Sequence, residues 1–162
     1  MRKLPRIVTR DGNVDDISDI MLTMEAFFAY SGHDAADYCP HTMQASCLEV
    51  LLGLPGTKCF VAVDLDTERV VGHYGLFYQK KYSVRPILYE AHFAVQPEYV
   101  ISKAARKLTE RAIEFGNEVN ALTFYAGATS GIKRFDKSLI NLYSKFGMKP
   151  SGQMMRYDYG KI

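Results

Sequence analysis

The sequence has few cysteines, no long apolar run and almost no excess charge. Its three cysteines, Cys39, Cys47 and Cys59, are odd in number and lack the paired spacing of a metal site. A chain of 162 residues buries enough surface to fold without a disulfide or metal staple. Cys47 and Cys59 have apolar neighbours and are expected to be small core residues, which leaves Cys39 as the candidate reactive thiol.

The longest apolar runs fall far short of the roughly 20 residues that a membrane span needs. Residues 1–10 carry charge where a signal peptide has its apolar stretch. With 48% hydrophobic and 23% charged residues, the composition is that of a globular domain and excludes a disordered tail or a long coiled coil. We therefore expect a soluble, cytoplasmic protein with no membrane partner.

The distribution of charge limits the classes of binding partner that the sequence supports. A net charge of +2 is too small to indicate nucleic-acid binding by itself. Residues 1–120 hold 13 basic and 16 acidic side chains, whereas residues 121–162 hold 7 and 2. This basic segment is typical of a solvated surface or of a site for an anionic ligand. No aromatic and glycine-rich RNA-binding motif accompanies its cations, so a nucleic-acid partner is not expected.

Hydrophobic periodicity predicts alternating blocks of helix and strand. The expected helices cover residues 14–31, 43–54, 102–119 and 136–146, and the expected strands cover 4–9, 58–64, 69–80, 87–95, 122–126 and 154–159. Asn13 or Asp15 would cap the first helix, Asp136 the last, and residues 32–41 would be irregular. This order predicts one α/β (α+β) domain over residues 1–162. Its central mixed sheet would have about six to seven strands, flanked by about four helices.

Two local sequences, together with this order of elements, resemble the GNAT acetyltransferase superfamily. Phe93-Ala-Val-Gln-Pro-Glu-Tyr, leading into a helix as far as Leu108, is similar to the strand, loop and helix that bind acetyl-coenzyme A. Asn141-Leu-Tyr-Ser-Lys-Phe-Gly-Met148 is similar to the family's N-L-Y-x-x-x-G-F. The resemblance implies a GNAT-like domain, acetyl-CoA as cofactor and transfer of its acetyl group to a primary amine.

The resemblance also implies a cofactor site, although the loop is degenerate. In the family the pyrophosphate lies on a helix N-terminus, where free N–H groups and the helix dipole hold it. Here Val100 stands at the family's Arg/Gln position, and Lys103 and Ala105 stand at two glycine positions. The implied cofactor-binding residues are Phe93, Ala94, Val95, Ile101, Ser102, Lys103, Ala104, Ala105, Arg106 and Asn141.

Glu90 and Tyr143 are the candidate catalytic residues. A carboxylate in an apolar strand has a raised pKa, as a general base for an amine needs, and Glu90 lies in the register of a family base. The alternative is a structural carboxylate paired with Arg or Lys on the next strand. Strand alternation predicts that His92 shares its face and is a second candidate base or relay. Tyr143 matches the family tyrosine that protonates the leaving thiolate; otherwise it is a half-buried helix tyrosine.

The acceptor pocket is predicted beside the first two helices. Its candidate residues are Tyr30, His33, Tyr38 and His92, which would face a small-molecule or peptide amine. No metal site is predicted, and a homodimer is left open. The sequence thus predicts an acyl-CoA-dependent N-acetyltransferase. The alternative is a catalytically inactive GNAT-fold binding or regulatory module, because the loop lacks the family's arginine and two of its glycines.

Overall fold

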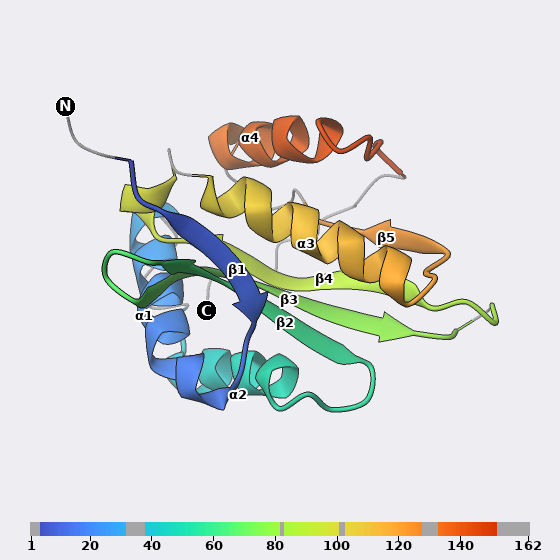
Figure 1. Cartoon of the computed structure of the whole chain (residues 1–162), viewed down its shortest axis with the longest axis horizontal. Coiled ribbons are helices and arrows are strands. Elements are labelled where there is room, and N and C mark those ends of the chain that lie inside the picture. The colour runs from blue at the N-terminus through green and yellow to red at the C-terminus, as the bar shows by residue number, and fades with distance from the viewer. Residues whose placement is uncertain (1–3, 32–37, 82, 101–102, 128–132, 152–162) are drawn as a thin grey trace, which may run out of the picture.

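A computed structural model describes residues 4–31, 38–81, 83–100, 103–127 and 133–151 (Figure 1). Its centre is one sheet in which five strands lie side by side in sequence order. The strands are β1 (Ile7–Asp11), β2 (Thr57–Asp64), β3 (Arg69–Gln79), β4 (Ile87–Val95) and β5 (Thr123–Tyr125). The first four are antiparallel, whereas β5 runs parallel to β4 after a helical crossover. The expected change from antiparallel to parallel pairing is therefore confirmed.

The expected count of six to seven strands is not matched, because the described residues form five. Five predicted strands correspond to β1–β5, and the sixth, at residues 154–159, lies outside the described residues. The four expected α-helices are present: α1 (Ile17–Ser31), α2 (Pro40–Leu51), α3 (Ala104–Glu118) and α4 (Lys133–Ser144). Two short 3-10 turns, Val14–Asp16 and Pro97–Tyr99, precede α1 and α3. The class of mixed α+β fold is as expected.

Several helix ends differ from the predicted ones. The helix α2 begins at Pro40, inside the segment expected to be irregular, because proline suits the first helical position, where no N–H partner is required. The helix α4 begins at Lys133, so Asp136 lies in its first turn and is not its cap. Asn13 does cap the turn before α1, since its side chain accepts from the Asp15 N–H at 2.8 Å.

The two faces of the sheet carry separate apolar cores. On one face α3 packs through Leu108, Ala112 and Phe115 against residues such as Phe60 and Leu76. On the other face α1 and α2 pack against the sheet (Figure 1), and this core contains Ile20, Met24, Cys47, Val50, Cys59, Val61 and Ala94. Both Cys47 and Cys59 are buried, as their apolar neighbours predicted.

A bulge in β4 overturns one prediction. Gly75 lies opposite His92 and Leu76 lies opposite Glu90, so Ala91 is one residue more than β3 can pair. An extra residue breaks the strict alternation of side chains along a strand. The Glu90 side chain contacts Tyr74, a member of the α3 core, whereas the His92 ring lies against the Ser46 carbonyl of α2. The prediction that Glu90 and His92 share a face is wrong.

Candidate active site

The Glu90 carboxylate is held by two tyrosine hydroxyls from two other elements. Its Oε2 accepts a hydrogen bond from Tyr143 of α4 at 2.5 Å and one from Tyr74 of β3 at 2.7 Å. The two hydroxyl oxygens are 3.3 Å apart. Tyr74 is 0% and Tyr143 6% exposed, so this cluster is largely shielded from water. The structure therefore brings together the two predicted catalytic residues and adds Tyr74.

Burial and hydrogen bonding act on this cluster in opposite directions. Burial raises the pKa of Glu90, and the bonds from Tyr143, Tyr74 and the Gly127 N–H partly offset that rise. Burial, followed by the charge of Glu90, raises the pKa of both Tyr74 and Tyr143, so both hydroxyls stay protonated and donate. Within the described residues, the partners of Glu90 are these donors and not the arginine or lysine of the structural alternative.

The strands β4 and β5 part next to this carboxylate. Their pairing covers Ile87–Tyr89 against Thr123–Tyr125, and the Tyr89 and Tyr125 rings stack at 5.6 Å over its last pair. From Glu90 onwards β4 pairs with β3 alone within the described residues. A groove of about 520 Å³ lies between β5 and α4, and Tyr143 is part of its lining. Splayed strands of this kind leave backbone polar groups for a ligand to bind.

By the resemblance, Phe93, Ala94 and Val95 would bind the cofactor through backbone groups rather than side chains. The Phe93 ring stacks on Tyr74 at 4.7 Å, Ala94 lies in the α1/α2 core, and Val95 packs against the α3 core. Their side chains are thus occupied by packing, while the β4 edge that carries them has no β5 partner among the described residues. Their contact with a cofactor stays a prediction.

The predicted pyrophosphate site is described in part. Lys103 precedes α3 without a side-chain cap hydrogen bond, and both Lys103 and Arg106 are exposed. Ala104 is fully buried in the α3 core, and Ala105 is half-buried. Ile101 and Ser102 lie outside the described residues. Asn141 is exposed on α4, two residues before Tyr143. Two cations therefore stand at the start of α3, where its dipole also favours an anion.

Three of the predicted acceptor residues, Tyr30, Tyr38 and His92, lie within the described part of the chain. Tyr30 lies in the last turn of α1 and is 51% exposed. The Tyr38 ring is half-buried and lies 4.8 Å from the Phe28 ring. His33 lies outside the described residues. His92 points to the face opposite Glu90, because of the bulge.

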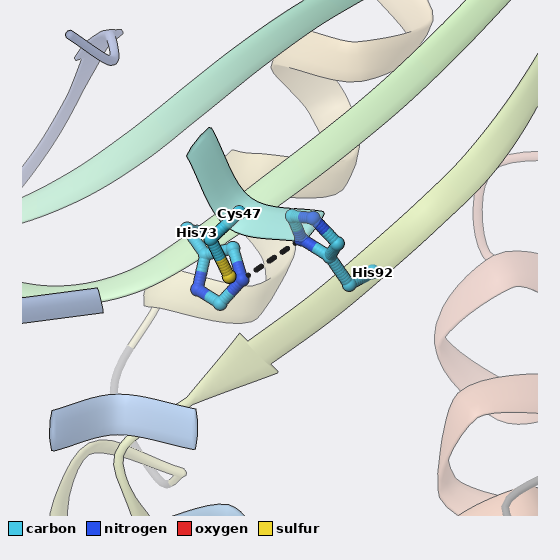
Figure 2. Close-up of side chains that lie close together, drawn as sticks. All are labelled: Cys47, His73 and His92. Atoms are coloured by element: carbon cyan, nitrogen blue, oxygen red, sulfur yellow. Dashed lines mark hydrogen bonds between the residues drawn. The ribbon is translucent and has the colours of Figure 1, made fainter. Parts of the chain in front are cut away.

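Sequence reasoning missed a second polar cluster, on the α1/α2 face. His92 meets His73 of β3 there, with His73 Nε2 3.1 Å from His92 Nδ1, and Cys47 of α2 lies against them (Figure 2). Burial lowers the pKa of both histidines and raises the pKa of Cys47 to about 11. The three residues lie in three separate elements, so no local spacing signals the cluster.

No protein-family model matches the chain, and no curated protein matches its sequence. Solved structures do match. A possible acetyltransferase from Clostridium difficile 630 superposes with a TM-score of 0.73 at 16% identity, covering 96% of this chain and 98% of that one. A Trypanosoma brucei acetyltransferase has a TM-score of 0.69 at 19% identity, covering 95% and 100%. The chain described here therefore shares its fold with acetyltransferases.

An aminoglycoside acetyltransferase from an uncultured soil metagenomic sample has the same fold, with a TM-score of 0.69 at 16% identity over 96% of both chains. Identities this low establish the fold and leave the chemistry to be argued from the residues of this chain. Among the described residues, no helix is both long enough and apolar enough to cross a bilayer.

Proposed function

We propose that this chain is an acyl-CoA-dependent N-acetyltransferase, which moves an acetyl group from acetyl-CoA to a primary amine. The observation that carries the proposal is the contact between the Glu90 carboxylate and the Tyr143 hydroxyl at the point where β4 and β5 part. A proton acceptor and a proton donor thus lie next to an unpaired strand edge and an open groove. The shared fold of the acetyltransferases supports this interpretation.

The chemistry needs one proton removed and one supplied. As the amine nitrogen bonds to the acetyl carbon, Glu90 accepts a proton from that nitrogen, directly or through water. The bond between the acetyl carbon and sulfur breaks, and Tyr143 donates its hydroxyl proton to the departing thiolate. The proton held by Glu90 then passes to the Tyr143 oxygen across their 2.5 Å hydrogen bond, which restores both groups. The β4 edge and the start of α3 would hold the acetyl-CoA.

The test is thiol release from acetyl-CoA with a panel of amines, comparing Tyr143→Phe, Glu90→Gln and a matched Tyr78→Phe. Tyr78 is a tyrosine of β3 that packs on Phe115 and is not part of the lining of the groove. Loss of a positioned proton donor or acceptor costs roughly 10²–10⁴-fold in rate, so kcat of Tyr143→Phe and of Glu90→Gln should fall by that much. Tyr78→Phe should keep the wild-type rate.

The competing function is a GNAT-fold module that binds without catalysis, and the exposed Lys103 at a glycine position of the loop favours it. Thiol release separates the two functions, and calorimetry with acetyl-CoA tests the cofactor binding that both share. Cofactor binding without thiol release across the amine panel would support the module. Turnover at the wild-type rate in a folded Tyr143→Phe would show that Tyr143 is not the acid. Absence of acetyl-CoA binding would contradict both functions.

A further inference from the structure

Three metal-ligating side chains converge in the α1/α2 core. Cys47 comes from α2, His73 from β3 and His92 from β4, and Figure 2 shows them grouped together. One ligand atom from each residue lies within 4.8 Å of the other two. Cys47 and His73 are both 0% exposed. A core position is usually apolar, so two histidines and a thiol meeting in this one place need a physical explanation.

Hydrogen bonding alone does not satisfy this cluster. His92 Nε2 lies 3.4 Å from the Ser46 carbonyl, so that nitrogen carries the proton and His92 Nδ1 presents a lone pair toward His73. His73 Nδ1 is buried and has no hydrogen-bond partner within the described residues. Leaving a buried polar atom unpaired destabilises a fold, and an apolar side chain at position 73 would avoid that cost. An ion bound through His73 Nε2 would leave the proton on Nδ1, so the metal accounts for the convergence of the three donor side chains and not for this one atom.

The distances suit a tetrahedral ion. Two nitrogens bound to Zn²⁺ at about 2.0–2.1 Å lie about 3.4 Å apart, close to the 3.1 Å between His73 Nε2 and His92 Nδ1. A thiolate sulfur binds Zn²⁺ at about 2.3 Å, so a shift of about 1 Å would bring Cys47 Sγ within bonding distance of an ion held by the two histidines. Ser46 supplies the backbone carbonyl that commonly orients a metal-bound imidazole through its other nitrogen.

The glycine opposite His92 makes room for this arrangement. Gly75 pairs with His92 across the ladder, and a Cβ at Gly75 would lie 2.6 Å from His92 Cε1. A side chain there would displace the ring from His73. The β3 sequence Gly-His-Tyr-Gly therefore leaves space for the His92 ring beside His73.

We propose that Cys47, His73 and His92 form a binding site for Zn²⁺ or a similar transition-metal ion, with the fourth position held by water. Two imidazoles and a thiolate are donors that Zn²⁺ prefers, and the lack of a carboxylate among them disfavours Mg²⁺ and Ca²⁺. The ion would tie α2 to β3 and β4. This site is on the face opposite Glu90, so it stands or falls independently of the proposed acetyl transfer.

The experiment removes metals with a chelator and then titrates the full chain with Zn²⁺ by calorimetry and with Co²⁺ by absorption. The wild type should bind one ion, show a thiolate-to-cobalt charge-transfer band and gain thermal stability. Cys47→Ala should lose the band and more than about 100-fold in affinity, because even outer-shell groups contribute about 10–100-fold. Cys59→Ala is the matched control, since Cys59 is buried in the same core, and it should bind as the wild type does.

A second measurement avoids dependence on a variant that fails to fold. In the wild type, Zn²⁺ should slow alkylation of Cys47, mapped by mass spectrometry, while the exposed Cys39 reacts equally with and without the ion. Three results would overturn the proposal: no Zn²⁺ binding at micromolar concentration, binding unchanged in Cys47→Ala, or binding lost in Cys39→Ser instead.

Discussion

Replacing Tyr74 with phenylalanine removes one oxygen from the centre of the carboxylate cluster. The ring is fully buried and stacks on Phe93, and phenylalanine can keep that contact. The variant loses the 2.7 Å hydrogen bond to Glu90 and the weaker 3.3 Å contact with the Tyr143 hydroxyl. Hydrogen bonds to charged groups contribute about 1.5–3 kcal/mol, so Tyr74→Phe should lower the free energy of unfolding by that amount.

The effect is large enough to measure by thermal or urea unfolding. In a domain of this size each kcal/mol shifts Tm by about 2–4 °C, so the expected decrease is roughly 3–12 °C. Tyr78→Phe is the matched control, because Tyr78 packs on Phe115 in the same core and its hydroxyl has no hydrogen bond within the described residues. That variant should change stability by less than about 0.5 kcal/mol.

A double-mutant cycle tests whether the loss of stability comes from the interaction between Tyr74 and Glu90. If Tyr74 acts through Glu90, then Tyr74→Phe in a Glu90→Gln background should cost clearly less than it does in the wild type. Equal costs in both backgrounds, or a Tm for Tyr74→Phe equal to that of Tyr78→Phe, would show that the hydrogen bond from Tyr74 to Glu90 does not stabilise the fold. The cycle rests on stability alone and needs no substrate.

Two further predictions concern charge. Lys103→Glu should weaken acetyl-CoA binding in calorimetry at low salt, because it places a like charge beside the pyrophosphate. Lys80→Glu, at an exposed position just after β3, should bind as the wild type does, and equal affinities of the two variants would place the phosphate site elsewhere. Asp19 accepts hydrogen bonds from the Arg69 side chain and from the Val70 N–H, and both lower the pKa of its carboxyl group. These contacts therefore stabilise the folded state above the unfolded carboxyl pKa of about 3.9. That stabilisation is lost as the pH falls through the lower pKa of the folded state. Asp19→Asn should therefore cost about 1 kcal/mol in urea unfolding at pH 7 and progressively less in acid below pH 4; a cost independent of pH would contradict this.

The sequence predicted the elements better than their mutual register. Apolar spacing located all four helices and five strands, because periodicity is a local property of each segment. The resemblance also selected Glu90 and Tyr143 as candidate catalytic residues, and in the fold the Tyr143 hydroxyl lies 2.5 Å from Glu90 Oε2. The bulge at Ala91 was missed, since the pairing of β4 with β3 decides it and the β4 sequence alternates normally by itself.

Tyr74 and His73 were missed for a related reason. Both are ordinary residues of an apolar strand when β3 is considered alone. Their roles arise from contacts 16 and 19 residues away along the chain, to Glu90 and His92. No motif spacing reports such contacts before the register of the hairpin is known. Convergence of side chains from separate elements is thus the part of a site that a sequence conceals.

Because of the extra residue in β4, that strand separates two side-chain clusters, one on each face of the sheet. Ala91 turns Glu90 toward the tyrosines and His92 toward His73, so a substitution on one side need not disturb the other. If β4 kept Ala91 but paired with β3 without the bulge, Glu90 and His92 would lie two residues apart on one face. The carboxylate and the imidazole would then share one environment, and two chemically separate compartments would become one.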